Sequence, residues 1–305
     1  MNKESKIYVA GHNGMVGSAC WRLLEKQGYQ SLIGKNSNEL DLRNQEDVFN
    51  FFKNEKPDIV IDAAAKVGGI WTNNEYPFEF LMDNMLIQNN LINSSLKNNV
   101  KKFIFLGSSC IYPKNAPQPI KEDFLLTSNL EPTNQWYAIA KISGVKLIES
   151  IRKQFGYDYV ALMPTNLYGP GDNYDLKTSH VLPALIRKYH EAKLNGGNVI
   201  LWGTGSPLRE FLHVDDLARA ITLFLKNESN DYLYNVGSGE EISIRNLAEL
   251  VSKVIGFCGE TKWDKSMPDG TPRKLLDSKK IERFGFKSKI NLEQGIKEVY
   301  KSYIL

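Results

Sequence analysis

The chain has few cysteines, no long apolar run and little excess charge. Its three cysteines, Cys20, Cys110 and Cys258, have neither metal-ligand nor Cys-x-x-Cys spacing. No apolar run approaches the ~18 to 20 residues of a membrane span, and no signal peptide is visible at the polar start. The 38 basic and 35 acidic side chains leave a net charge of +3, which gives no general case for nucleic-acid or membrane binding. These absences predict a reduced, cytoplasmic protein without a metal site.

The composition is that of an ordinary globular protein, with 305 residues of which 42% are hydrophobic and 24% charged. Helical patterns separate five short strand patterns, at residues 6–10, 31–34, 58–62, 102–106 and 158–163. This alternation predicts an α/β fold with a Rossmann-type, doubly wound parallel sheet. The alternation loosens after residue 165, so we expect a first domain over 1–165 and a smaller C-terminal α/β domain mainly over 166–305. Segments at about 195–220 are expected to return to the first domain.

A glycine-rich turn follows the first predicted strand and precedes a helical pattern. Gly11 permits a tight turn, Gly14 lets a pyrophosphate approach the helix N-terminus, and Gly17 lets helix and strand pack closely. Three spaced glycines alone are weak evidence, but between a strand and a helix they favour dinucleotide binding over a plain turn.

The second predicted strand bears on the choice of dinucleotide. A site specific for NAD usually ends this strand with a carboxylate for the ribose 2′-hydroxyl, and none stands there. Lys35, which does follow the strand, could meet a 2′-phosphate instead. NADP is therefore favoured, and NAD is not excluded.

Tyr137 and Lys141 lie in a run with helical spacing, so both side chains are expected on one helix face. An ammonium beside a phenol favours the phenolate, which predicts a lowered pKa for Tyr137. Such a tyrosine can exchange a proton while a hydride moves to or from a carbonyl carbon. Taken alone, the spacing is more often that of a core aromatic residue and a solvated lysine.

Three further residues carry functional groups at expected loop positions. Ser108 and Cys110 follow the fourth strand, where a doubly wound sheet binds ligands. As structural residues they would be a hydroxyl bonded to its own loop and a small buried side chain. His180 is expected in the first turn of a helix over 181–195, capped by Ser179, and alone would more often be a surface histidine.

Together these features resemble the extended short-chain dehydrogenase/reductase superfamily. Within it the chain is similar to the GDP-L-fucose synthase family, the 3,5-epimerase-4-reductases of GDP-4-keto-6-deoxy-D-mannose. The segments that carry the likeness are Gly11 to Ala19, Ala63 to Ile70, Leu106 to Pro113, Glu131 to Asn134, Tyr137 to Lys141, Met163 to Pro170, Arg209 to Asp216 and Pro268 to Leu276.

The resemblance implies roles for these residues. Ser108 orients the substrate ketone, Tyr137 exchanges its proton, and Lys141 supports the tyrosine and the nicotinamide ribose, while Cys110 acts as base and His180 as acid in epimerisation. The substrate-binding domain is expected to hold GDP through Lys188, Trp202, Arg209 and Asp269. The dinucleotide-binding domain is expected to hold NADP through Gly11, His12, Asn13, Gly14, Met15, Val16, Gly17, Lys35, Asp41, Leu42, Ala63, Ala64, Leu106, Gly107, Ser108, Tyr137, Lys141, Pro164, Asn166, Leu167 and His180.

The resemblance also implies a homodimer, joined through helices at 84–98 and 134–150. Two positions depart from the family pattern: Asn13 and Ser37 stand where arginines commonly hold the 2′-phosphate of NADP. Trp136 also stands where a smaller residue is common.

Two other classes of function stay open at this point. Another nucleotide-sugar enzyme, such as a 4-epimerase or a 4-ketoreductase, would keep Tyr137 and Lys141 but would not need Cys110 and His180. A binding protein that senses a dinucleotide without turnover would not need the Ser, Tyr and Lys set, which is complete here.

Overall fold

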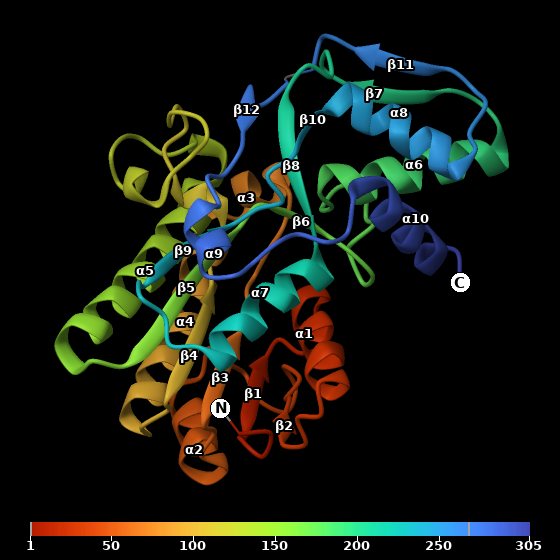
Figure 1. Cartoon of the computed structure of the whole chain (residues 1–305). Helices are drawn as coiled ribbons and strands as arrows, with labels where there is room; N and C mark the ends of the chain where they lie inside the picture. The colour runs from red at the N-terminus through yellow and green to blue at the C-terminus, as the bar shows by residue number, and fades with distance from the viewer. Residues whose placement is uncertain (1, 268) are drawn as a thin grey trace.

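The computed structural model describes residues 2–267 and 269–305 (Figure 1). Pro268, which begins one of the family-like segments, lies outside the described residues. Among those described, no helix is both long and apolar enough to cross a membrane.

The largest sheet has six parallel strands in the order β2-β1-β3-β4-β5-β9. Five of them occupy the predicted strand positions, and the sixth, β9, was not predicted. Their bounds are β1 Ile7–Ala10, β2 Leu32–Ile33, β3 Ile59–Asp62, β4 Lys102–Leu106, β5 Asp158–Pro164 and β9 Leu233–Val236. The predicted doubly wound parallel sheet is confirmed.

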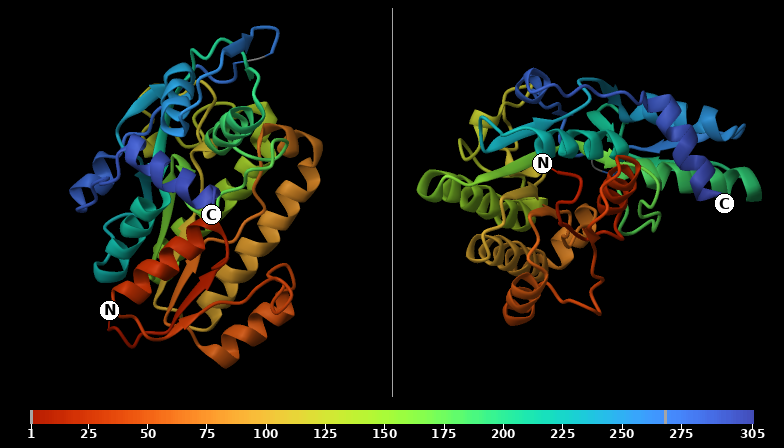
Figure 2. Two further views of the ribbon diagram at one scale, coloured as in Figure 1. Left: turned by 90° about the vertical axis from the view of Figure 1, so that its right-hand side faces the viewer. Right: turned by 60° about the horizontal axis from the view of Figure 1, so that its bottom comes forward.

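Strand β1 shows why the sheet is covered on both faces. Ile7 and Val9 point into one hydrophobic core, and Tyr8 and Ala10 point into another, because side chains alternate along a strand. Helices α1 and α7 cover the first face, and α2, α4 and α5 cover the second. The left view of Figure 2 shows α1 (red) and α7 (teal) across the strands from the long helix α4 (orange). The bounds are α1 Met15–Lys26, α2 Gln45–Glu55, α4 Pro77–Lys97, α5 Gln135–Phe155 and α7 Val214–Lys226.

A smaller α/β part follows, as predicted. Strand β8 pairs in parallel with β6 and β12 and antiparallel with β10, and β7 pairs in parallel with β11. Helices α6, α8 and α10 pack around a third core beside these strands (Figure 1). The bounds are β6 Asn166–Tyr168, β7 Val199–Trp202, β8 Leu208–His213, β10 Glu241–Ser243, β11 Thr261–Asp264, β12 Arg273–Lys274, α6 Val181–Asn195, α8 Ile244–Ile255 and α10 Leu292–Tyr303.

The two parts exchange segments along the chain. Strand β8 belongs to the smaller sheet, and α7, which follows it directly, packs against α1 on the large sheet. Strand β9 then completes the large sheet, and the short helix α9, Lys279–Arg283, contributes Ile281 to its core. The domain division at residues 165 and 166 stays a prediction.

Candidate active site

The order of the large sheet places a crevice beside β1 and β3. The chain leaves β1 for the edge strand β2 and then returns to β3 on the other side, which makes a switch point between β1 and β3. Ligands of doubly wound sheets bind at the carboxyl ends of the strands at such a point. The segments that begin at Gly11, Ala63 and Gly107 all leave the sheet at this edge.

The glycine turn is shaped for close backbone approach. Gly11 has φ +75°, and a Cβ atom there would lie 2.8 Å from the Ala63 carbonyl oxygen. The Gly14 N–H donates to the Gly11 carbonyl over 2.9 Å. Gly14 is also the N-cap of α1, and no side chain caps this helix. The turn therefore leaves the N–H groups of Met15, Val16 and Gly17 at the helix start for an anion.

Charged side chains and a histidine lie near the end of β2. The Lys35 ammonium lies 3.4 Å from the Glu39 carboxylate, and the His12 imidazole packs against Gly34 with its Nδ1 atom buried and lacking a partner among the described residues. Sequence reasoning missed Glu39 because it lies beyond the strand end, in a turn whose shape the sequence does not reveal. Asp41, predicted beside the cofactor, is held by Arg43 at 2.9 Å.

Other residues predicted to bind the cofactor lie near the carboxyl edge of the large sheet. Hydrogen bonds from Arg43 hold the pKa of the Asp41 carboxyl below its usual range. Leu42 packs on the core under α2 and α4, and Asn13 is exposed. At the end of β4, Gly107 has no room for a side chain because Met163 lies against it.

Tyr137 and Lys141 do lie on one helix, α5, but their electrostatics differ from the prediction. The Lys141 ammonium donates to the Leu106 carbonyl oxygen over 2.9 Å and lies 5.8 Å from the centre of the Tyr137 ring. The pKa of Tyr137 is raised, by burial first and then by Cys110 and Asp62. The predicted lowering is wrong, since burial, Cys110 and Asp62 all raise this pKa.

Cys110 and His180 share a cationic neighbour that sequence reasoning did not single out. Burial raises the pKa of the Cys110 thiol, and Lys274 on β12 opposes that rise. Burial and the same Lys274 lower the pKa of His180. Before substrate binds, the proton therefore stays on sulfur and the imidazole is neutral, and Lys274 favours loss of the thiol proton.

The loop before α6 positions His180. The Gly69 N–H donates to the Thr178 carbonyl oxygen over 2.9 Å, which ties this loop to the segment after β3 and to the short helix α3, Ile70–Glu75. His180, and not Ser179, is the N-cap residue of α6, and its side chain accepts no capping bond. The Ser179 hydroxyl has no partner among the described residues, so the predicted serine cap is wrong.

The four residues predicted for GDP lie close together, although far apart in sequence. The Asp269 carboxylate accepts hydrogen bonds of 2.6 and 2.7 Å from the backbone N–H and hydroxyl of Thr204, two residues after Trp202. The Lys188 ammonium donates to the Ile200 carbonyl over 3.0 Å. Arg209 stands beside Lys274 in the register of β8 and β12, and burial and then the charge of Arg209 lower the pKa of Lys274.

This group has the chemistry of a nucleotide diphosphate site. Trp202 on β7 is 63% exposed, which leaves its ring available for stacking. Burial lowers the pKa values of both Lys188 and Arg209. A diphosphate would supply the anions that the two cations lack. At the other end of the crevice, Pro164 ends β5, while Asn166 and Leu167 begin β6, where the Asn166 amide donates to the Glu210 carbonyl over 2.8 Å.

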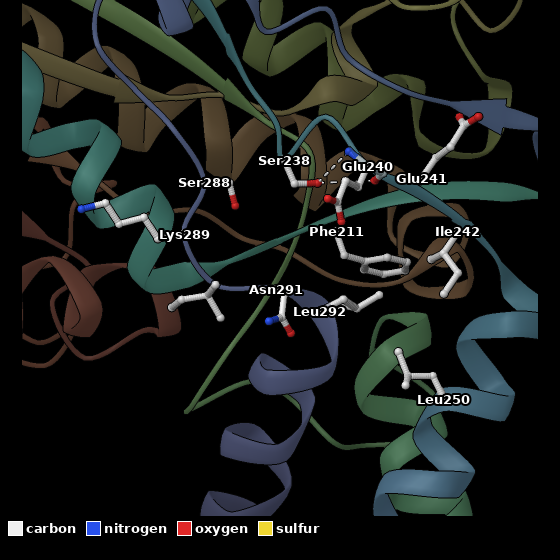
Figure 3. A pocket seen from close by; sticks show the side chains of 11 residues that line it. Phe211, Ser238, Glu240, Glu241, Ile242, Leu250, Ser288, Lys289, Asn291 and Leu292 are labelled. Carbon is white, nitrogen blue, oxygen red and sulfur yellow. Dashed lines mark hydrogen bonds between the residues drawn. The ribbon is translucent and has the colours of Figure 1, made fainter.

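A separate pocket of about 260 Å³ lies between β8, β10, α8 and the start of α10 (Figure 3). Phe211, Ile242 and Leu292 line its apolar side, and Ser238 and Glu240 its polar rim. None of the residues that line it was predicted to take part in catalysis or binding. The described residues hold no group of three or more His, Cys, Asp or Glu side chains placed for a metal ion.

Comparisons with known proteins agree with this geometry. The family model described as "NAD dependent epimerase/dehydratase family" matches residues 7–237. GDP-L-fucose synthase 1 of Arabidopsis thaliana is 56% identical over 304 residues, which cover 99% of this chain and 94% of that protein. GDP-L-fucose synthase of Escherichia coli (strain K12) is 48% identical over 314 residues, with 100% and 98% covered. A solved GDP-mannoheptose C4 reductase from Campylobacter jejuni with NADP bound has a TM-score of 0.93 and 39% identity, with 100% of both chains covered.

Proposed function

The chain belongs to the NAD dependent epimerase/dehydratase family, and within it we propose that the protein makes GDP-L-fucose from GDP-4-keto-6-deoxy-D-mannose, with NADPH as hydride donor. It is an oxidoreductase and an epimerase in one chain. The observation that supports the proposal is that the charge of Lys274 acts on the pKa values of both Cys110 and His180, while the charge of Cys110 acts on those of Tyr137 and Lys141.

Epimerisation uses the ketone at C4 of the sugar. This ketone acidifies the protons at C3 and C5, because the carbanion left behind is delocalised as an enolate. Cys110, once its thiol has given its proton to solvent, takes a proton from one face of the sugar. His180, once it has taken a proton from solvent, returns one to the other face. The Lys274 charge opposes the effect of burial on the Cys110 pKa and so favours the thiolate that this step needs.

Reduction uses the same ketone. When bound, the reduced nicotinamide supplies the hydride that C4 accepts. Tyr137 gives the oxygen its proton, Ser108 orients that oxygen, and Lys141 fixes the tyrosine from the next helical turn. The raised pKa of Tyr137 suits this direction, since a proton donor must hold its proton at the working pH.

The residues at the crevice fit the cofactor. The glycine turn packs closely on Ala63, where a side chain at Gly11 would collide, and the uncapped start of α1 favours the negative charge of a pyrophosphate. We propose that Lys35 and the unpartnered Nδ1 of His12 meet the 2′-phosphate of NADP in place of the arginines that the family commonly has at positions 13 and 37.

For the substrate, we propose that Trp202 stacks on the guanine and Asp269 accepts its N–H groups, while Lys188 and Arg209 hold the diphosphate. The division of labour is then by domain. Residues 1–165 mainly bind the cofactor, together with α7, which packs on the large sheet. The rest of residues 166–305 mainly binds the nucleotide sugar.

Product identity tests the function. The protein is incubated with NADPH and GDP-4-keto-6-deoxy-D-mannose, and the product is compared with GDP-L-fucose by chromatography and mass spectrometry. We expect GDP-L-fucose with equimolar loss of NADPH. A C4-reduced sugar of unchanged C3 and C5 configuration would establish a plain 4-ketoreductase, and absence of any turnover would leave a dinucleotide-binding protein.

We propose a homodimer through α4 and α5, which pack side by side (Figure 1). Phe78, Met82 and Leu86 form an apolar stripe at helical spacing on α4 and are 67%, 41% and 37% exposed. On α5, Trp136 and Ile139 are 38% and 40% exposed, which gives Trp136 a place in this surface. Exposed apolar stripes of this kind mark protein interfaces.

Light scattering tests the dimer. The double variant Met82→Glu, Leu86→Glu should become monomeric at concentrations where the wild type is dimeric. Phe155→Glu, at an exposed apolar residue on the far end of α5, should stay dimeric. A monomeric wild type would overturn the proposal.

We also propose a cytoplasmic location, which the free thiols of Cys20, Cys110 and Cys258 support.

A further inference from the structure

Asp62 is a buried carboxylate at the end of β3 that the reaction described above does not use. Its side chain is 0% exposed and lies on the sheet face covered by α4 and α5, because Val60, two residues earlier, lies in that core. One oxygen, Oδ1, accepts the Ala64 N–H over 3.3 Å. The other, Oδ2, has no partner among the described residues. Burying a carboxylate with an unpartnered oxygen costs free energy, so we expect Asp62 to have a function in this core.

The geometry points to Lys141 as the reason. In the sheet register, Asp62 stands beside Phe105, and the Lys141 ammonium lies 4.7 Å from the centre of the Phe105 ring. Lys141 is itself only 2% exposed, and its one hydrogen bond among the described residues goes to the Leu106 carbonyl. The buried Lys141 ammonium has three N–H groups and, among the described residues, one hydrogen-bond acceptor and no bonded anion. The Asp62 carboxylate supplies a negative charge from β3, the strand next to β4.

Polar and charged side chains from several elements lie around Asp62. Tyr8 from β1 has a buried hydroxyl without a partner among the described residues. Tyr137 and Lys141 come from α5, and Cys110 from the turn after β4. On α4, the Asp83 carboxylate is engaged 3.0 Å from Lys66 on the outer side. Lys141 is therefore the cation that faces the Asp62 carboxylate.

We propose that Asp62 is a positioning residue of the reductase site, whose buried charge keeps Lys141 charged and Tyr137 protonated, as proton donation to the reduced ketone requires. The inference rests on the proposed function and deepens it. A positive charge near a tyrosine favours loss of its proton, so Lys141 without Asp62 would make Tyr137 a poorer holder of its proton. The negative charge of Asp62 balances the positive charge of Lys141, so Tyr137 keeps its proton and can donate it to the ketone oxygen.

The causes of the pKa shifts agree with this arrangement. Burial lowers the pKa of Lys141, and Asp62 is the first of the groups that oppose the fall. The pKa of Tyr137 is raised by burial, by Cys110 and by Asp62. Removing the Asp62 charge should therefore lower the pKa values of Tyr137 and Lys141 together. Asp62 does not act directly on the pKa of Cys110 and reaches it only through the charge of Lys141, so proton exchange by the cysteine should respond less than hydride transfer does.

The test is the pH dependence of the holoenzyme. Asp62→Asn and Asp62→Leu remove the charge, and Asp58→Asn is the matched control, because Asp58 precedes the same strand but pairs with Lys101 at the surface, 2.8 Å away. For each protein, NADPH oxidation and exchange of solvent deuterium into C3 and C5 are measured at each pH. In both Asp62 variants, we expect the alkaline limb of NADPH oxidation to move about one pH unit toward acid. The exchange profile should move by less than the NADPH-oxidation profile, and the control should match the wild type in both.

A titration independent of turnover separates this inference from the proposed function. Ultraviolet absorbance of tyrosinate is followed in the wild type and in Asp62→Asn, each with and without Tyr137→Phe, so that the difference isolates Tyr137. The Tyr137 component should appear at lower pH without the Asp62 charge. An unchanged component together with an unmoved rate limb would overturn the role of Asp62. Movement of this component in a protein that makes no GDP-L-fucose would keep the role and overturn the function.

Discussion

Asp62→Asn should make the protein more stable at neutral and alkaline pH. Burial raises the pKa of Asp62 from 3.8 to about 6, with Lys141 opposing the rise. The unfolded chain therefore loses this proton at lower pH than the folded protein does, and the fold loses stability as pH rises from about 4 through about 6. A pKa difference of about two units corresponds to about 3 kcal/mol of unfolding free energy. Asparagine keeps an oxygen for the Ala64 N–H without the charge, so the variant should recover most of that energy.

The assay is thermal and urea unfolding followed by circular dichroism, at fixed protein concentration, across the range from pH 4 to pH 8. At about 2.1 cal/mol/K per residue, 3 kcal/mol in a chain of 305 residues corresponds to a rise in Tm of about 5 °C at pH 8. The rise should shrink to a small remainder near pH 4, where the folded wild-type carboxyl is protonated and the unfolded one is about half ionised.

Asp58→Asn is the control with the opposite sign. Hydrogen bonds from Lys101 and the Lys6 backbone lower the pKa of Asp58, so its charge stabilises the fold above the unfolded pKa and that contribution is lost as pH falls. This variant should be less stable than the wild type at pH 8. Equal stability of Asp62→Asn and wild type at pH 8, or a difference that does not change with pH, would refute the reasoning.

Other substitutions separate the parts of the site. Cys110→Ser should abolish solvent exchange at C3 and C5 with cofactor affinity unchanged in a fluorescence titration, and equal exchange would remove Cys110 as base. Tyr137→Phe should slow NADPH oxidation by about 10²- to 10⁴-fold while exchange persists, and equal loss of both would contradict the division of labour. Lys35→Ala should raise the KM for NADPH about tenfold or more and leave that for NADH unchanged, whereas Glu39→Gln should lower the KM for NADPH, as steady-state kinetics would show. Lys274→Met should move the pH profile of exchange toward alkali, because the lysine opposes the raised pKa of Cys110, and an unmoved profile would exclude that role.

Short-range patterns predicted the parts of the molecule that local physics decides. The strand, glycine turn and helix from Lys6 to Gly28 followed from side-chain alternation and from the need for a positive φ at Gly11. The shared helix of Tyr137 and Lys141 followed from their spacing. Strand β9, Leu233–Val236, was missed because it lies in a region where strand and helix patterns no longer alternate.

The electrostatics of the site could not be predicted in the same way. The pKa of Tyr137 is raised by its burial first and then by Cys110 and Asp62, which the fold brings to it from other segments. Lys274 lies in a two-residue strand whose register beside Arg209 on β8 has no sequence signal. The family-like segment around it marked the region, but only the fold brings its charge to Cys110 and His180.

The central claim is that one bound sugar meets both the proton carriers and the hydride donor. The most direct measurement is the position of deuterium in the product that forms in heavy water with NADPH. The account predicts solvent deuterium at both C3 and C5 of the reduced sugar and none at C4. Reduced sugar without deuterium at C3 and C5 would contradict it, and would leave Cys110 and His180 outside the chemistry.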